Sequence, residues 1–121
     1  MNSQALRKLV VDAIEELKGV DVVSLDVRGL TDVTDFMVIA SGRSDRQVGA
    51  IAENVIEKAK AAGVRPLGVE GLDRREWVLV DLCDVVVHVM QPQTREYYQL
   101  EKLWSGLDSL PRSSELRALQ P

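Results

Sequence analysis

The stretch that decides the fold is WVLVDLCDVVVHVM, Trp77–Met90, in which a short polar break separates two apolar runs rich in valine. Runs of β-branched residues on both sides of a turn predict two paired strands. If residues 82–83 form a two-residue loop, Asp81 lies opposite Asp84. The stretch therefore predicts a β-hairpin.

Alternation along the two strands assigns their side chains to two faces of the sheet. One face is a row of valines: Val78, Val80, Val85, Val87 and Val89. The same count places Trp77 opposite His88 on the other face, where the neighbours are Leu79, Val86 and Met90. Because both faces are apolar, we expect a helix or another molecule to cover the second one.

Cys83 and His88 are the only cysteine and histidine of the chain, which makes them candidate metal ligands or a nucleophile pair. Five strand residues separate them by about 16 Å, too far to share one ion or one proton. We therefore interpret His88 as a packed sheet residue beside Trp77 and Cys83 as a turn residue. The sequence predicts neither a metal nor a cofactor.

Apolar residues recur at helical spacing in three segments, which predict three helices over about residues 6–17, 48–59 and 97–107. Gly19 and Gly63 follow the first two and are suited to end them. Ser44 is placed to cap the second helix, with Gln47 completing a capping box. Thr94 is placed to cap the third.

Three further segments predict the rest of the sheet. Residues 23–27 alternate between apolar and polar, as in a strand near an edge, whereas Phe36–Ala40 is continuously apolar, as in a central strand. A short strand and a glycine-rich turn follow at residues 65–71. The order αββαβββα predicts an α+β fold with a mixed five-stranded sheet packed by helices. We expect one domain over residues 1–107 and a fraying tail over residues 108–121.

Charge and composition narrow the classes of partner and compartment. The net charge of −4 disfavours nucleic acid and favours a basic partner. One cysteine and an N-terminus without a secretory signal predict a cytoplasmic protein. No apolar run approaches the roughly 20 residues that cross a membrane, so no membrane association is predicted.

Asp81 and Asp84 could instead hold a divalent cation, and SGRSDRQ, residues 41–47, lies between strand and helix as a phosphate cradle would. Together they define an alternative, a metal-dependent nucleotidyltransferase. Such an enzyme places its paired carboxylates one residue apart on a strand soon after that helix, so that both face the same metal ions. Here two residues separate them, far downstream. We prefer the capping interpretation of SGRSDRQ, with direct RNA contact by Arg43 and Arg46 a minor option.

Three blocks in order resemble the ribosomal silencing factor family, also called Iojap. They are TDFMVIASGRSDRQVGAIAENV, GVEG and EWVLVDLCDVVVHVMQPQTREYYQLEKLW, and the resemblance runs from about Leu6 to Trp104. It implies a fold similar to that of nucleotidyltransferases but without the catalytic carboxylates. It also implies a protein that acts by binding and is not an enzyme.

The mechanism that the resemblance implies is steric repression of translation. The factor would bind the large ribosomal subunit through ribosomal protein number fourteen and block joining of the small subunit when nutrients are limiting. Trp77 and Tyr98 carry over as aromatic contacts. The other motif residues expected near the same surface are Asp81, Asp84, His88, Arg95 and Glu101.

The sequence leaves two questions open, the oligomeric state and the geometry of the turn at Cys83. A homodimer that buries Trp77, Val86 and Met90 is compatible with ribosome binding. Members of the family usually have glycine where this chain has Cys83. If that position needs a positive φ, a side chain there costs on the order of 1 kcal/mol and could change the turn.

Overall fold

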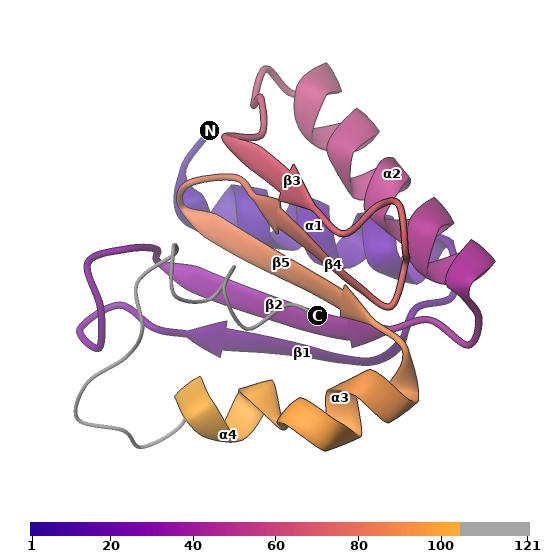
Figure 1. The fold of residues 1–121 in the computed structure, drawn as a ribbon. Coiled ribbons are helices and arrows are strands. Elements are labelled where there is room, and N and C mark those ends of the chain that lie inside the picture. Colours follow the sequence, from indigo (N-terminus) through magenta and orange to yellow (C-terminus); the bar gives the residue numbers. More distant parts are fainter. Residues whose placement is uncertain (105–121) are drawn as a thin grey trace.

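A five-stranded sheet lies between two pairs of helices in the computed structural model, which describes residues 1–104 (Figure 1). Its elements are α1 (Ser3–Glu16), β1 (Val20–Asp26), β2 (Phe36–Ser41), α2 (Asp45–Ala61), β3 (Gly68–Glu70), β4 (Trp77–Asp81), β5 (Val85–Met90), α3 (Pro92–Tyr98) and α4 (Leu100–Trp104). None of the helices in this described part is long and apolar enough to cross a membrane. The predicted α+β class is confirmed, whereas the predicted tail lies outside the described residues.

The strand order is β1-β2-β5-β4-β3, with β5 in the centre. Only β2 and β5 run parallel, and the other neighbours are antiparallel, so the sheet is mixed as predicted. β1 lies at an edge and β2 is buried along its whole length, as their sequence patterns indicated. The parallel pair places Ser41 beside Met90, and α2 and α3 begin just beyond these two residues.

The hairpin of β4 and β5 forms, but the predicted pairing was wrong by two residues. Leu82 donates its N–H to the carbonyl of Val85 at 3.0 Å, which leaves residues 83–84 as the loop. Trp77 consequently lies opposite Met90, and Leu79 opposite His88. The observed register buries the Leu82 side chain in the core instead of exposing it in a loop. Because the shift is an even number, every side chain stays on its predicted face.

Cys83 is the central residue of the hairpin turn. Its φ is +72°, and Asp84 donates its N–H to the carbonyl of Leu82 at 2.9 Å, the pattern of a γ-turn. The Asp81 carboxylate accepts the N–H of Cys83 at 2.9 Å. The turn that suits glycine is therefore kept with a cysteine in it, at a strain of about 1–2 kcal/mol.

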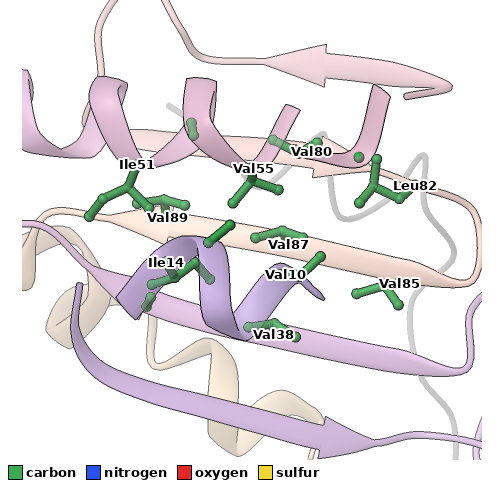
Figure 2. Close-up of a cluster of buried hydrophobic side chains, with 14 of the residues drawn as sticks. Val10, Ile14, Val38, Ile51, Val55, Val80, Leu82, Val85, Val87 and Val89 are labelled. Atoms are coloured by element: carbon green, nitrogen blue, oxygen red, sulfur yellow. The ribbon is translucent and has the colours of Figure 1, made fainter. Parts of the chain in front are cut away.

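α1 and α2 cover the valine face of the sheet (Figures 1 and 2). In Figure 2, Val10 and Ile14 of α1 and Ile51 and Val55 of α2 point toward the strands. The strands contribute Val38, Val80, Val85, Val87 and Val89, and Leu82 extends the cluster beyond the end of β4. The predicted row of valines thus forms the sheet side of the larger hydrophobic core.

Gln47 joins the start of α2 to the end of α1. Ser44 caps α2 as predicted, accepting the N–H of Gln47 at 3.1 Å. The Gln47 side chain departs from a capping box, because its Oε1 accepts the N–H of Arg43 at 2.6 Å. Its Nε2 donates to the carbonyls of Leu17 and Lys18, at 3.2 and 3.1 Å.

The two helix ends predicted at glycines behave differently. Gly63 has φ +85° and ends α2 as predicted. At the end of α1 the left-handed residue is Lys18, with φ +61°, and the N–H groups of Lys18 and Gly19 return to the carbonyls of Glu15 and Ile14. Gly19 is needed for space, because a Cβ there would lie 2.3 Å from Cγ2 of Ile14.

The predicted last helix is broken in two, so the observed order is αββαβββαα. α3 begins at Pro92 with Gln91 as its N-cap, not Thr94, because proline already has the φ of a first helical turn. It ends at Gln99, whose φ of +48° is left-handed, and α4 begins at the next residue. Of the expected apolar stripe, Leu100 is buried. The side chains of residues 103 and 104 and all of residue 107 lie outside what the structure describes.

Candidate functional site

The second face of the sheet carries most of the residues predicted for the site. Its buried cluster comprises Val27, Met37, Ile39, Trp77, Leu79, Val86, Met90 and Leu100. α3 and α4 lie on this side of the sheet, opposite α1 and α2 (Figure 1), and α4 contributes Leu100. Of the two covers that the sequence left open, a helix of the same chain is the one observed.

A buried hydrogen bond joins Trp77 and His88. Nε1 of Trp77 donates to Nδ1 of His88 at 2.8 Å, although the two residues are diagonal neighbours and not opposite each other. The bond requires the neutral histidine tautomer with its proton on Nε2, and that Nε2 has no hydrogen-bond partner among the residues that the structure describes. Burial lowers the pKa of His88 to about 3, so the ring is neutral at physiological pH.

A chain of aromatic contacts leads from this bond to the surface. The Trp77 ring packs on Tyr98 with 4.9 Å between centroids, and Tyr98 meets Tyr97 edge-on at 4.9 Å and 77°. Exposure rises along the way, from 2% for Trp77 to 36% for Tyr98 and 81% for Tyr97. We call His88, Trp77, Tyr98 and Tyr97 the aromatic chain.

The aromatic chain changes two expectations about the site. Trp77, predicted as an aromatic contact, is buried and has almost no surface to offer a partner. Tyr97 begins the segment of helical apolar spacing at residues 97–107 and was therefore expected to be buried, but it is the most exposed large apolar side chain among residues 1–102. Tyr97 and Leu100 would share one helix face if the helix continued unbroken, and the left-handed residue Gln99 interrupts the helix between them.

A hollow of about 240 Å³ opens beside the two tyrosines, lined by Glu76, Gln93, Thr94, Tyr97 and Tyr98. Gln91 holds the end of the loop before β4, residues 75–76, against the start of α3. Its N–H donates to the carbonyl of Glu76 at 2.9 Å, and its Nε2 donates to that of Arg75 at 3.1 Å. Glu76 therefore has a fixed position beside α3.

Arg95 and Glu101 brace α3 and α4 against the end of β2. Arg95 is buried, and its Nη1 donates to Oγ of Ser41 at 2.9 Å. Its Nη2 and Nε lie 3.1 and 3.2 Å from Oε2 of Glu101. The pair crosses the left-handed break at Gln99, so these two motif residues fix the angle between the helices. Both also line a second hollow, of about 310 Å³.

Asp81 and Asp84 lie apart from the aromatic chain. Four strand steps of about 3.3 Å separate Trp77 from Asp81 along β4. Asp81 is buried and accepts the turn N–H, while Asp84 is exposed in the loop. The predicted site is therefore divided between the two ends of the hairpin. Among residues 1–104, no group of three or more histidine, cysteine, aspartate or glutamate side chains is placed to hold a metal ion.

The fold and the site together define a small α+β domain that presents an aromatic surface at one end of its sheet. A family model described as "Ribosomal silencing factor during starvation" matches residues 1–120. The chain belongs to this family, which confirms the resemblance in its motifs.

Individual proteins give the same result. The chain is 49% identical over 106 residues to the ribosomal silencing factor RsfS of Chromobacterium violaceum, covering 88% of this chain and 87% of that one. It is 32% identical over 101 residues to chloroplastic Iojap of Zea mays, covering 78% of this chain and 41% of that one. A crystal structure of a Chromobacterium violaceum protein superposes with a TM-score of 0.86 at 48% identity, covering 88% of this chain and 89% of that one.

Proposed function

We propose that this protein represses translation by binding the large ribosomal subunit through ribosomal protein number fourteen. Bound there, it would sterically block joining of the small subunit when nutrients are limiting. The observation that carries the proposal is the match of residues 1–120 to the family of silencing factors. Its relatives are named for an effect on ribosomes and not for a reaction, in keeping with a role that is not enzymatic.

The surface of the molecule supports a protein partner. Tyr97 and Tyr98 are exposed next to each other on α3, and aromatic residues are over-represented among the side chains that dominate binding energy. The net charge of −4 complements a basic ribosomal protein and speeds encounter with it. The same charge repels phosphates, so RNA contact has a minor part in the proposal. A cytoplasmic location follows from the partner.

The two other readings of the sequence receive less support. The homodimer hypothesis predicts that Trp77, Val86 and Met90 are buried between two copies, but these side chains are already buried within one chain. The nucleotidyltransferase was to use Asp81 and Asp84, but Asp81 closes the turn and Asp84 points to solvent. No observation therefore favours either as a second function.

Sedimentation with ribosomal subunits tests the proposal directly. The purified protein should pellet with isolated large subunits and not with small subunits. Added before mixing, it should lower the yield of joined ribosomes, measured by light scattering. Failure to co-sediment with large subunits, or unchanged joining at saturating protein, would contradict the proposal.

A further inference from the structure

The exposure of Tyr97 has no structural explanation within the described part of the chain. Its ring meets the edge of Tyr98 and is otherwise open to solvent, whereas large aromatics normally contribute to a core. Tyr98 packs on Trp77, and Trp77 is fixed by its bond to His88. The edge contact with this supported Tyr98 ring restricts the Tyr97 ring before any partner arrives, which lowers the entropy cost of using it in binding.

The hollow beside Tyr97 has the size for one side chain. At about 240 Å³ it is smaller than the roughly 300–1,000 Å³ typical of small-molecule sites. Its lining offers the two tyrosine rings, the neutral polar side chains of Gln93 and Thr94, and one charged group, the carboxylate of Glu76. The salt bridges of residues 1–104 do not include Glu76, so this carboxylate has no ion-pair partner in that part of the chain.

We infer that the hollow receives an arginine or lysine side chain of the basic protein partner. This inference rests on the proposed function and names what the partner inserts. The cation would pair with Glu76 and lie against the ring of Tyr97, since the face of an aromatic ring attracts cations within about 6 Å. Arginine fits best, because its planar guanidinium can stack on the ring while it donates hydrogen bonds to the carboxylate.

Other occupants fit the lining less well. A phosphate group would meet the Glu76 carboxylate and be repelled by it. An apolar side chain would take that carboxylate out of water without a partner, which costs free energy. Charge therefore selects a cation, and the neutral lining of Gln93 and Thr94 adds no competing positive group.

Four substitutions in the full chain test the inference, with Glu96 as the matched control. Glu96 precedes Tyr97 on α3 and carries the same charge as Glu76, but it lines the hollow that contains Arg95. The affinity for isolated ribosomal protein number fourteen and for large subunits would be measured at low and physiological salt for Glu76→Gln, Glu96→Gln, Tyr97→Phe and Tyr97→Leu. Thermal melting would verify that each variant is folded.

Glu76→Gln should weaken binding by about three- to tenfold and reduce its salt dependence, while Glu96→Gln should change the affinity less than about twofold. Tyr97→Leu should weaken binding by roughly three- to tenfold, because it removes the ring face. Tyr97→Phe should bind nearly as well as the unmodified protein, since only the hydroxyl is lost.

Three results would overturn the inference while leaving the proposed function intact. They are equal affinities for Glu76→Gln and Glu96→Gln, unchanged affinity for Tyr97→Leu, and a loss with Tyr97→Phe as large as with Tyr97→Leu. If the unmodified protein binds large subunits but not the isolated ribosomal protein, the same comparisons on subunits decide the inference. An unmodified protein that binds neither would refute the proposed function and this inference with it.

Discussion

At the scale of single residues, the hairpin turn shows a strained side chain in a position suited to glycine. Cys83 has φ +72°, and the turn keeps both of its hydrogen bonds. Cys83→Gly should remove about 1–2 kcal/mol of strain and lose about 0.4–1 kcal/mol to the greater freedom of the unfolded chain. We expect a net gain of roughly 0.5–1 kcal/mol, measured as a higher urea midpoint with an unchanged slope.

Cys83→Ala is the control for this prediction. Alanine removes the thiol but keeps a Cβ, so it keeps the strain and should leave the free energy of unfolding nearly unchanged. A gain of the same size with alanine and with glycine would show that the thiol, and not the backbone conformation, limits stability.

The buried His88 should make stability depend on pH below neutrality. Its pKa is about 3 in the folded protein and about 6.5 when unfolded, so the unfolded chain binds the additional proton between these values. The stabilisation is therefore present above pH 6.5 and is lost as the pH falls. Between pH 7 and pH 5 the loss should be about 2 kcal/mol from this group alone.

His88→Asn isolates that contribution. The asparagine carboxamide oxygen can accept the Trp77 Nε1–H in place of Nδ1, but it does not titrate. The variant should be less stable at pH 7, because the asparagine side chain is smaller than the imidazole and fills the buried site less well. Its free energy of unfolding should nevertheless fall less between pH 7 and pH 5. Urea unfolding at each pH measures both effects. Parallel stability curves for the two proteins would contradict the assignment of the pH dependence to His88.

The faces of the hairpin could be predicted from the sequence, but its pairing could not. Alternation alone assigned Trp77 and His88 to one face and the valines to the other. The register depends on which two residues form the turn, and that choice was decided by burial of Leu82 and by the bond from Asp81 to Cys83. Neither contact is visible in the periodicity.

At the scale of elements, helix ends were harder to predict than helix faces. The break at Gln99 leaves no sequence signal, because glutamine is an ordinary helix residue. It is stabilised by the pair of Arg95 and Glu101 on either side, a contact that exists only in the folded chain. Tyr97, expected on the buried stripe, is exposed on α3 just before this break, so the break is where the sequence misjudged which side chains of this segment are buried.

Gln47 offers a test of how α1 and α2 are joined. Its side chain makes hydrogen bonds to Arg43, Leu17 and Lys18, which connect the start of one helix with the end of the other. Gln47→Ala should lower the free energy of unfolding by about 1–2 kcal/mol, since each such bond contributes roughly 0.5–1.5 kcal/mol and these are partly solvated. Urea unfolding measures the change.

Gln4→Ala is the matched control, because Gln4 lies exposed in the first turn of α1. Its loss should change stability by less than about 0.5 kcal/mol. An equal effect of the two substitutions would mean that Gln47 acts only as an ordinary helix residue and does not connect the helices.

At the scale of the whole molecule, the two faces of the sheet have different roles. The valine face packs against α1 and α2 and supplies most of the core, which the sequence predicted because its pattern is regular. The second face carries a smaller cluster and, through Trp77, the support for the exposed tyrosines. On this face we therefore expect the buried Trp77 to contribute mainly to stability and the partly exposed Tyr98 to contribute mainly to binding.

Trp77→Ala should accordingly lower mainly the stability of the protein, and Tyr98→Ala mainly its affinity for the partner. Trp77→Ala empties a buried site and leaves Nδ1 of His88 without its donor, so it should cost about 3–5 kcal/mol of stability. Tyr98→Ala removes a partly exposed ring and should cost about 1 kcal/mol. Urea unfolding and co-sedimentation with large subunits would be measured on both variants.

Binding should then follow surface position and not stability. Tyr98→Ala should lose affinity for the subunit while remaining folded, whereas Trp77→Phe should keep most of its affinity, because the phenyl ring can still support Tyr98 although the bond to His88 is lost. If Trp77→Phe bound as weakly as Tyr98→Ala while fully folded, the indole group itself would have to reach the partner. That outcome would require α3 to move away from the sheet on binding, since Trp77 lies beneath Tyr98 in the free protein.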